Sequence, residues 1–322
     1  MFSDQENRLS NFGKNKIEKR IMKKFRINCG QARILAAIML LTILVARSKA
    51  QTYSFKVLKH GKGQPVILIP GLTCDGAVWD ETVATLKKDY ECHVLTLPGF
   101  AGHLPIDLGQ GYLPQVRKEI IAYVHDQHLV HPIVIGHSLG GHLALDIAST
   151  KPNLVSRLVI VDALPFLGAL HNPNATEASA KAVAEGMKKR YSDISDEQYK
   201  ANQLTILKTM ITDEEMVKVA LEWSLSSDRS SVNRAMYELM TTDLRDDMVR
   251  INIPVMVLGS WVAAKEYGVT KEMVLASFSN QYRQLKGVEI SLSEKGRHFI
   301  MWDDFEFYIN EIDSFLSRNK VN

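Results

Sequence analysis

The chain has 322 residues, 46% of them hydrophobic and 23% charged, which is enough for one large α/β domain with an insertion. Its formal charge of +3 arises in the first fifty residues, which hold 11 Lys and Arg against 3 Asp and Glu. The rest carries 28 basic and 33 acidic residues, a net charge near −5, which gives no support to nucleic-acid binding.

The N-terminal segment has the layout of a secretory signal. An unbroken apolar run from Ile34 to Ala46 follows basic residues and precedes small ones. The run is too short to cross a bilayer comfortably, which takes about 20 residues. We therefore predict a signal peptide over residues 1–50 and an exported protein, periplasmic or secreted. If translation starts at Met22, residues 1–21 are an over-extension of the N-terminus. After cleavage we expect no stable membrane insertion; the alternative is an uncleaved membrane anchor, with Arg47 and Lys49 halting transfer.

The remaining chain alternates between strand-like and helix-like segments, which predicts a mainly parallel sheet with helices on both faces. Apolar and β-branched runs mark the strands, and apolar residues at helical spacing mark the helices. The expected strands are 53–60, 65–69, 92–97, 133–137, 154–161, 254–258 and 288–292, and the expected helices are 78–88, 113–128, 142–148 and 305–316.

Residues 163–250 contain helical patterns alone. Two capping-box patterns, Ser195–Gln198 and Thr212–Glu215, mark helix starts. We predict a helical cap over 163–250 that interrupts a core formed by 51–162 and 251–322. Because the cap separates two strands of the sheet, it should lie over their carboxyl ends.

Two cysteines follow the expected signal peptide, Cys74 and Cys92. The helix expected between them would hold them too far apart for a disulfide, so we predict two free thiols. Cys74 has no sequence signal for a reactive thiolate and is expected to be a packing residue.

The most informative motif is G-x-S-x-G at Gly136, Ser138 and Gly140, between a buried strand pattern and a helix pattern. A sharp strand-to-helix turn exposes the serine oxygen above the sheet, and glycines are needed where the turn is tight. We therefore predict Ser138 to be a nucleophile. The unpaired amides of the following helix favour negative charge, so Leu139 N–H is a candidate oxyanion donor.

A serine nucleophile needs a base, an acid and a second oxyanion donor. His298 lies between the last strand and the last helix, where such a base is expected. Leu72, in the loop after an early strand, is the candidate second donor, and Gly71 before it allows close backbone approach. We found no metal-ligand spacing, and we expect neither a metal nor a cofactor.

These motifs resemble the α/β-hydrolase fold family, in its capped members with a serine nucleophile. The matching segments occur in the family's order: Pro70–Leu72, Leu97–Phe100, Gly136–Gly141 and Gly296–His298. The resemblance covers nearly all of the chain after the leader. It implies an eight-stranded sheet and a Ser–acid–His triad.

The acid departs from the family pattern. The resemblance would place it in the loop after strand 254–258, but residues 259–264 contain no carboxylate. Asp162, at the end of the preceding sheet strand, is the preferred substitute. Glu266, further along the loop, is the alternative acid.

We expect a serine hydrolase that cleaves a small-molecule substrate, a mostly apolar ester or other acyl compound, with Phe166 and Leu167 lining its site. An aminopeptidase or amidase similar to proline iminopeptidases is an alternative, with acidic residues at 213–215 gripping an amine. A lactonase or a carbon–carbon bond hydrolase would share the triad. A catalytically weak binding protein that retains the fold is the alternative of another class. The oligomeric state stays open.

Overall fold

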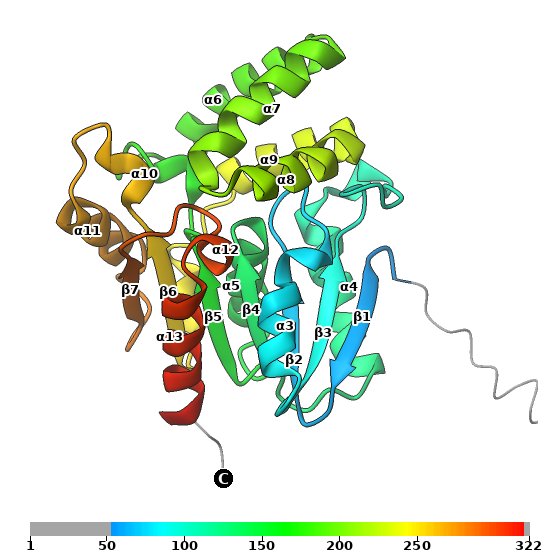
Figure 1. The fold of residues 1–322 in the computed structure, drawn as a ribbon, viewed down its shortest axis with the longest axis vertical. Coiled ribbons are helices and arrows are strands. Elements are labelled where there is room, and N and C mark those ends of the chain that lie inside the picture. The colour runs from blue at the N-terminus through cyan, green and yellow to red at the C-terminus, as the bar shows by residue number, and fades with distance from the viewer. Residues whose placement is uncertain (1–52, 319–322) are drawn as a thin grey trace, which may run out of the picture. The chain divides into compact units, whose positions relative to one another are not determined.

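The computed structural model describes residues 53–318, so the predicted signal peptide at 1–50 lies outside the described residues. One sheet forms the centre of this part, with the spatial order β1-β3-β2-β4-β5-β6-β7 (Figure 1). β1 pairs antiparallel with β3, and the other neighbouring strands are parallel. The strands are β1 (Lys56–Gly61), β2 (Gln64–Ile69), β3 (Tyr90–Thr96), β4 (Ile133–His137), β5 (Arg157–Val161), β6 (Val255–Ser260) and β7 (Glu289–Ser293).

The eight-stranded sheet that the family resemblance implied is wrong for the described residues, where the sheet has seven strands. A single strand, β1, precedes β2 and occupies the edge of the sheet beside β3. The mainly parallel α/β class is confirmed. β2 lies between β3 and β4, so the chain passes from β2 to β3 on one side and then crosses to β4 on the other side. The carboxyl ends of these strands therefore form a topological switch point, where α/β proteins bind ligands.

Helices cover both faces of the sheet because the central strands are apolar on both sides. Val66 and Leu68 of β2 pack toward one face, while Ile67 and Ile69 pack toward the other. Figure 1 shows α3 and α13 in front of the sheet and α4 and α5 behind it. The helices of the core are α3 (Asp80–Leu86), α4 (Leu113–Asp126), α5 (Leu139–Thr150), α10 (Val262–Lys265), α11 (Lys271–Gln281), α12 (Ile300–Asp303) and α13 (Phe305–Arg318).

Four helices lie between β5 and β6 in the chain, and Figure 1 shows them gathered at one end of the sheet. They are α6 (Glu177–Ser192), α7 (Asp196–Met210), α8 (Glu214–Ser226) and α9 (Arg229–Thr241). We call residues 163–250 the cap segment.

The predicted start of α7 is confirmed, because Ser195 and Gln198 form a capping box. The predicted capping box at Thr212 is wrong: Asp213 is the N-cap of α8, and its carboxylate accepts from Glu215 and Met216. The Asp213 carboxylate accepts from two free amides at once, so it caps the helix in place of the Thr212 hydroxyl.

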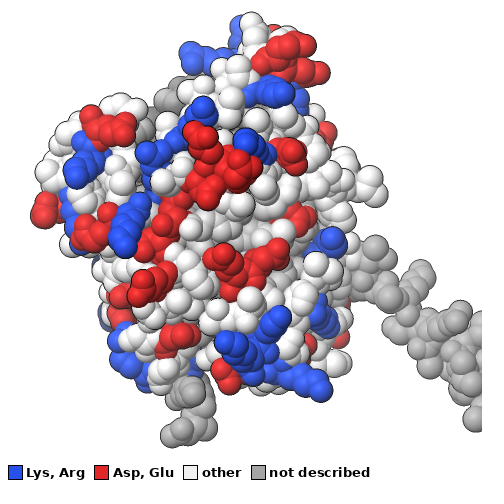
Figure 2. Space-filling model, in the orientation of Figure 1, with Lys and Arg blue, Asp and Glu red and all other residues white. Residues whose placement is uncertain are grey.

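Both predicted thiols are free and buried, and burial raises the pKa of Cys74 to about 12. Among the described residues, no helix is long and apolar enough to cross a membrane. On the face shown in Figure 2, acidic and basic side chains are interspersed with uncharged surface.

Candidate active site

The candidate nucleophile lies at a strained turn between β4 and α5. Ser138 has φ 53° and ψ −118°, a conformation that L-residues rarely adopt. Its N–H donates to Val161 O on β5 at 2.9 Å, and its carbonyl accepts from His142 N in α5 at 3.0 Å. The turn is thus anchored on both sides and holds the side chain at the carboxyl end of the sheet.

The glycines around Ser138 are required by close backbone contacts. A Cβ on Gly136 would lie 2.3 Å from Gly140 O, and one on Gly140 would lie 2.2 Å from Ile69 O. Gly140 O cannot move aside without shifting α5, and Ile69 O cannot do so without shifting β2. The G-x-S-x-G spacing therefore follows from the packing of β2, β4 and α5.

His298 and Asp162 meet across 136 residues of chain. His298 Nδ1 lies 2.6 Å from Asp162 Oδ2, and both side chains are largely buried. Because the carboxylate accepts, the ring proton lies on Nδ1 and Nε2 keeps a free lone pair. Asp162 itself has φ 46°, in the left-handed region that Asp and Asn tolerate better than other side chains.

The loop after β6, which contains no carboxylate, hydrogen-bonds to Asp162 at the end of the neighbouring strand β5. Asp162 Oδ1 accepts from Ser260 N at 2.8 Å, and Ser260 Oγ donates to Gly296 O at 3.0 Å. Of the two candidate acids, only Asp162 contacts His298, since Glu266 is exposed at the end of α10. The alternative of Glu266 is therefore wrong. Ser260 was not predicted from the sequence; its signal is its position at the end of β6, beside Asp162.

His137, the residue before Ser138, was also missed. Its Nε2 lies 3.0 Å from the carbonyl oxygen of His298, which can only accept, so Nε2 carries the proton. The ring is buried against His298 and Phe299. Burial, together with the nearby His298, holds the pKa of His137 well below its usual range. A neutral imidazole thus fixes the backbone of the candidate base.

A second carboxylate ties the cap segment to the loop of His298. Asp303 Oδ1 accepts from Thr212 N at 2.9 Å, and its Oδ2 accepts from Thr212 Oγ1 at 3.1 Å. Oδ2 also accepts from Arg297 N at 3.0 Å. Asp303 therefore links the joint between α7 and α8 to Arg297, the residue that precedes His298.

Ser138 and His298 line a cavity of about 270 Å³ between the sheet and the cap segment. Leu72 lines it too, and Leu139 is the first residue of α5, so both candidate oxyanion donors are at this site. Most of the wall is apolar, and it contains no Lys, Arg, Asp or Glu. The cap segment contributes Met187, Tyr199, Gln203, Ile206, Leu207, Met210, Ala220, Val232, Asn233 and Met236.

The prediction that Phe166 and Leu167 line the site is wrong, because neither is among the cavity residues. The Phe166 backbone exchanges two hydrogen bonds with the side chain of Gln281 in α11, and its ring lies under the Arg245 guanidinium at 4.9 Å. The chain thus turns into the interior after Asp162. Trp79 is also fully buried, as expected for a core residue.

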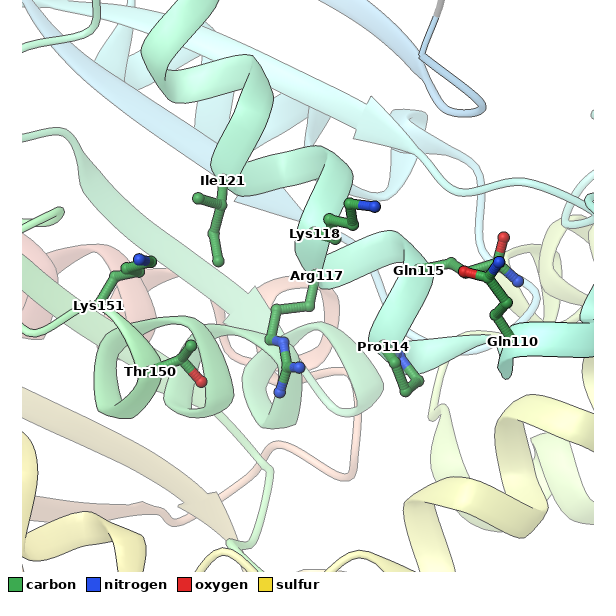
Figure 3. Close-up of a pocket in the computed structure, with 8 residues that line it drawn as sticks. All are labelled: Gln110, Pro114, Gln115, Arg117, Lys118, Ile121, Thr150 and Lys151. Atoms are coloured by element: carbon green, nitrogen blue, oxygen red, sulfur yellow. The ribbon is translucent and has the colours of Figure 1, made fainter.

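Figure 3 shows a second hollow, of about 370 Å³, between α4 and α5. It is lined mainly by polar side chains, and Arg117 there pairs with Asp146 at 2.7 Å. Neither Ser138 nor His298 lines it, so the chemistry is confined to the cavity under the cap segment.

A parallel α/β sheet with a serine at a strained strand-to-helix turn, facing a His–Asp pair, defines a hydrolase of the nucleophile-elbow class. Comparison with known families agrees: the model described as "Alpha/beta hydrolase family" matches residues 66–310. The chain therefore belongs to the α/β-hydrolase family and is a hydrolase.

Curated relatives include two esterases named pimeloyl-[acyl-carrier protein] methyl ester esterase. The one from Vibrio parahaemolyticus is 28% identical over 206 residues, which cover 62% of this chain and 75% of the relative. The one from Vibrio cholerae is 23% identical over 266 residues, covering 80% and 96%. Among solved structures, the enol-lactonase from Burkholderia xenovorans has a TM-score of 0.67 at 14% identity, covering 82% of this chain and 96% of that one. That likeness concerns the fold alone.

Proposed function

We propose that this protein is an exported serine esterase that hydrolyses a small, mostly apolar carboxylic ester through an acyl-enzyme on Ser138. The observation that carries the proposal is the cavity, where Ser138 and His298 share an apolar wall without Lys, Arg, Asp or Glu. Such a wall suits an uncharged acyl chain, because a charged group would lose its hydration without gaining a partner.

The geometry supports a two-stage reaction. Asp162 holds the Nδ1 proton of His298, so Nε2 accepts the proton of Ser138 as Oγ attacks the ester carbonyl. The proton then passes to the leaving alcohol as the C–O bond breaks. A water molecule, deprotonated by the same nitrogen, releases the acid and restores Ser138.

The developing oxyanion would be stabilised by the amides of Leu72 and Leu139. Leu139 is the first residue of α5, where amides have no intrahelical acceptor and the helix dipole favours negative charge. Leu72, in the loop after β2, lines the same cavity. Removing one such donor typically lowers kcat by about 10²–10³.

The size of the cavity supports a short substrate. Its volume of about 270 Å³ lies near the lower end of the ~300–1,000 Å³ range of small-molecule pockets. A short acyl chain buried in the apolar wall would supply most of the binding free energy.

A second candidate is an ester whose acyl chain is attached to a carrier, as in the names of the Vibrio relatives. The observation that favours it is Asn233, which lines both the cavity and a neighbouring surface pocket of about 280 Å³ that contains Lys188 and Arg234. A chain running past Asn233 would reach solvent there. Turnover of the carrier-bound methyl ester at least tenfold above that of the free ester would favour this candidate.

The aminopeptidase alternative gains no support from these contacts. Asp213 caps α8, Glu215 pairs with Lys218, and Glu214 is exposed on the same turn. None of the three lines the cavity, so no acidic pair faces Ser138. The weak-binding-protein alternative loses its main argument, since His298 has a carboxylate partner.

Export rests on the sequence of residues 1–50, which lie outside the described residues. N-terminal sequencing of the protein recovered from outside the cytoplasm tests it. Cleavage after the apolar run is expected. Recovery of the intact leader in the cytoplasm would reject export without touching the esterase proposal.

The esterase itself is tested with a fluorophosphonate probe and a series of chromogenic esters beside aminoacyl anilides. Wild-type protein should be labelled and should prefer esters. Ser138→Ala should abolish labelling and lower kcat by about 10⁶ while the protein stays folded. Folded wild-type protein that neither reacts with the probe nor hydrolyses any ester would refute the proposal.

A further inference from the structure

The wall that the cap segment contributes to the cavity contains two primary amides among apolar side chains. Gln203 comes from α7 and Asn233 from α9, while most of their neighbours in the wall are Met, Leu, Ile, Val or Ala. A polar side chain in an apolar wall weakens the burial of a hydrocarbon, so its presence needs a reason.

Gln203 is held in one orientation by a buried partner. Ser224 in α8 has no exposed surface, and its Oγ donates to Gln203 Oε1 at 3.2 Å. The amide oxygen is thereby occupied across the α7–α8 contact. Within residues 53–318, no protein acceptor takes a hydrogen bond from the Nε2 group, and Gln203 lines the cavity, so this group is available to a bound substrate.

We propose that Gln203 Nε2 is a specificity-determining donor that reads a neutral hydrogen-bond acceptor in the acyl part of the substrate. The substrate class is then an ester whose acyl chain carries an ether, keto or amide oxygen away from the scissile carbonyl. This inference rests on the proposed esterase function and narrows its substrate.

The contacts of Gln203 and the composition of the wall indicate which kind of substrate group would bind to Nε2. A donor facing the cavity selects an acceptor, because a second donor placed there would leave both groups unpaired. The group is neutral, since the wall offers no Lys or Arg to balance a carboxylate and no Asp or Glu to balance an amine. An oxygen inside the chain satisfies both conditions.

The expected discrimination follows from the cost of an unpaired amide. A plain alkyl chain displaces water from Nε2 and gives it no acceptor, whereas an oxygen at the right position replaces that water. Sites that hydrogen-bond a substrate group reject analogues without it far more strongly than apolar pockets reject a missing methylene. Because Gln203 is only partly buried, we expect a preference of about tenfold in kcat/KM.

The experiment is an oxygen scan along one chain. 4-Nitrophenyl octanoate is compared with the 5-oxa, 6-oxa and 7-oxa octanoate esters, which have nearly the same length and volume. Each enzymatic rate is divided by the rate of hydroxide hydrolysis of the same ester, which removes electronic effects. One oxa position should exceed octanoate by about tenfold. A flat scan would overturn the proposal.

Gln203→Met keeps the length of the side chain and removes the donor. The oxygen preference should then disappear, and the rate with octanoate should rise, because its alkyl chain no longer leaves an amide unpaired. Asn202→Leu, on the exposed side of the same helix, is the matched control and should keep the preference. A preference that persists in Gln203→Met would assign the recognition elsewhere and reject this role.

The same comparison is made without turnover. Binding of the methyl esters to Ser138→Ala by calorimetry should show the same oxygen preference, and it should be absent in Ser138→Ala/Gln203→Met. Fluorophosphonate labelling separates the two levels of inference. If the enzyme is labelled but the oxygen scan is flat, the Gln203 subsite alone is rejected. If the protein is neither labelled nor active, the esterase proposal is rejected. Equal binding of all the esters to such an inactive protein would reject the subsite as well.

Discussion

The sheet core and the cap segment are built by different rules. Strands β4 and β5 are buried along their whole length, and several backbone positions at their ends tolerate no Cβ or require a positive φ. In α6, by contrast, the buried side chains include only small ones such as Ala180 and Ala184, and most of the helix is exposed. The core therefore holds the reacting groups through its backbone, while the cap segment supplies most of the cavity wall.

The strongest way to test the role of the core is to remove the charge of its acid. Asp162→Asn should lower kcat by about 10⁴, equivalent to about 5.5 kcal/mol of transition-state stabilisation, because the wrong tautomer of His298 is then favoured. Steady-state kinetics with a chromogenic ester measures the effect. Glu266→Gln is the control and should change kcat less than twofold. Equal, small effects of the two variants would contradict a triad built on Asp162.

Acid should destabilise the protein through buried histidines of the core. Burial lowers the pKa of three core histidines, His93, His137 and His142, whereas the unfolded chain takes up protons near pH 6.5. Folding stability is thus complete above that pH and is lost as the pH falls below it. The free energy of unfolding should therefore decrease as the pH falls from 7 to 5, because the unfolded chain binds more protons than the folded one.

Urea unfolding between pH 7 and pH 5 measures this slope. His142→Gln should reduce it, since one of the three groups is removed. A free energy of unfolding that stays constant over this range would contradict the assignment of neutral, buried histidines.

A smaller effect is expected where the core holds the base through its backbone. His137→Phe keeps a ring beside Phe299 but loses the hydrogen bond to His298 O, so kcat should fall about 30-fold, or about 2 kcal/mol, with KM little changed. His93→Phe removes a buried histidine far from the site and should cost stability without lowering kcat. A similar fall of kcat in both variants would mean that His137 acts through stability alone.

The smallest effect should come from the cap wall. Met236→Ala enlarges the cavity, so the preferred acyl chain should lengthen by one or two carbons and kcat/KM for the longer ester should rise about fivefold. The rate of fluorophosphonate labelling should not change. Met273→Ala, on the exposed surface of α11, is the control. An unchanged chain-length profile would show that Met236 does not limit the chain.

The same contrast explains what was predictable from the sequence. The strands, the serine turn and the position of His298 follow from local patterns, since β-branched runs and required glycines are visible residue by residue. The choice between Asp162 and Glu266 was not local, because it depends on which strand end lies beside His298 in space. Ser260 was missed for the same reason, and because it contributes a backbone N–H to Asp162, which no residue type reveals.

The errors lie where the chain leaves the sheet. Phe166 follows the acid closely in sequence, but the interior contacts with Gln281 and Arg245 withdraw it from the cavity. The cavity wall instead comes from helices far along the chain, such as α7 and α9. Helical spacing identifies which residues of these helices are apolar, but not which of them face Ser138.

The backbone angles of Ser138 and Asp162 have a consequence for any attempt to make this protein more heat-resistant. Both residues hold a positive φ that typically costs about 1–3 kcal/mol, and glycine would relieve that cost in either place. Substitutions chosen for stability alone will therefore be drawn to the two positions that carry the chemistry. A useful search for thermostable variants should screen for turnover at every step, and should look for its gains at the exposed faces of the cap helices.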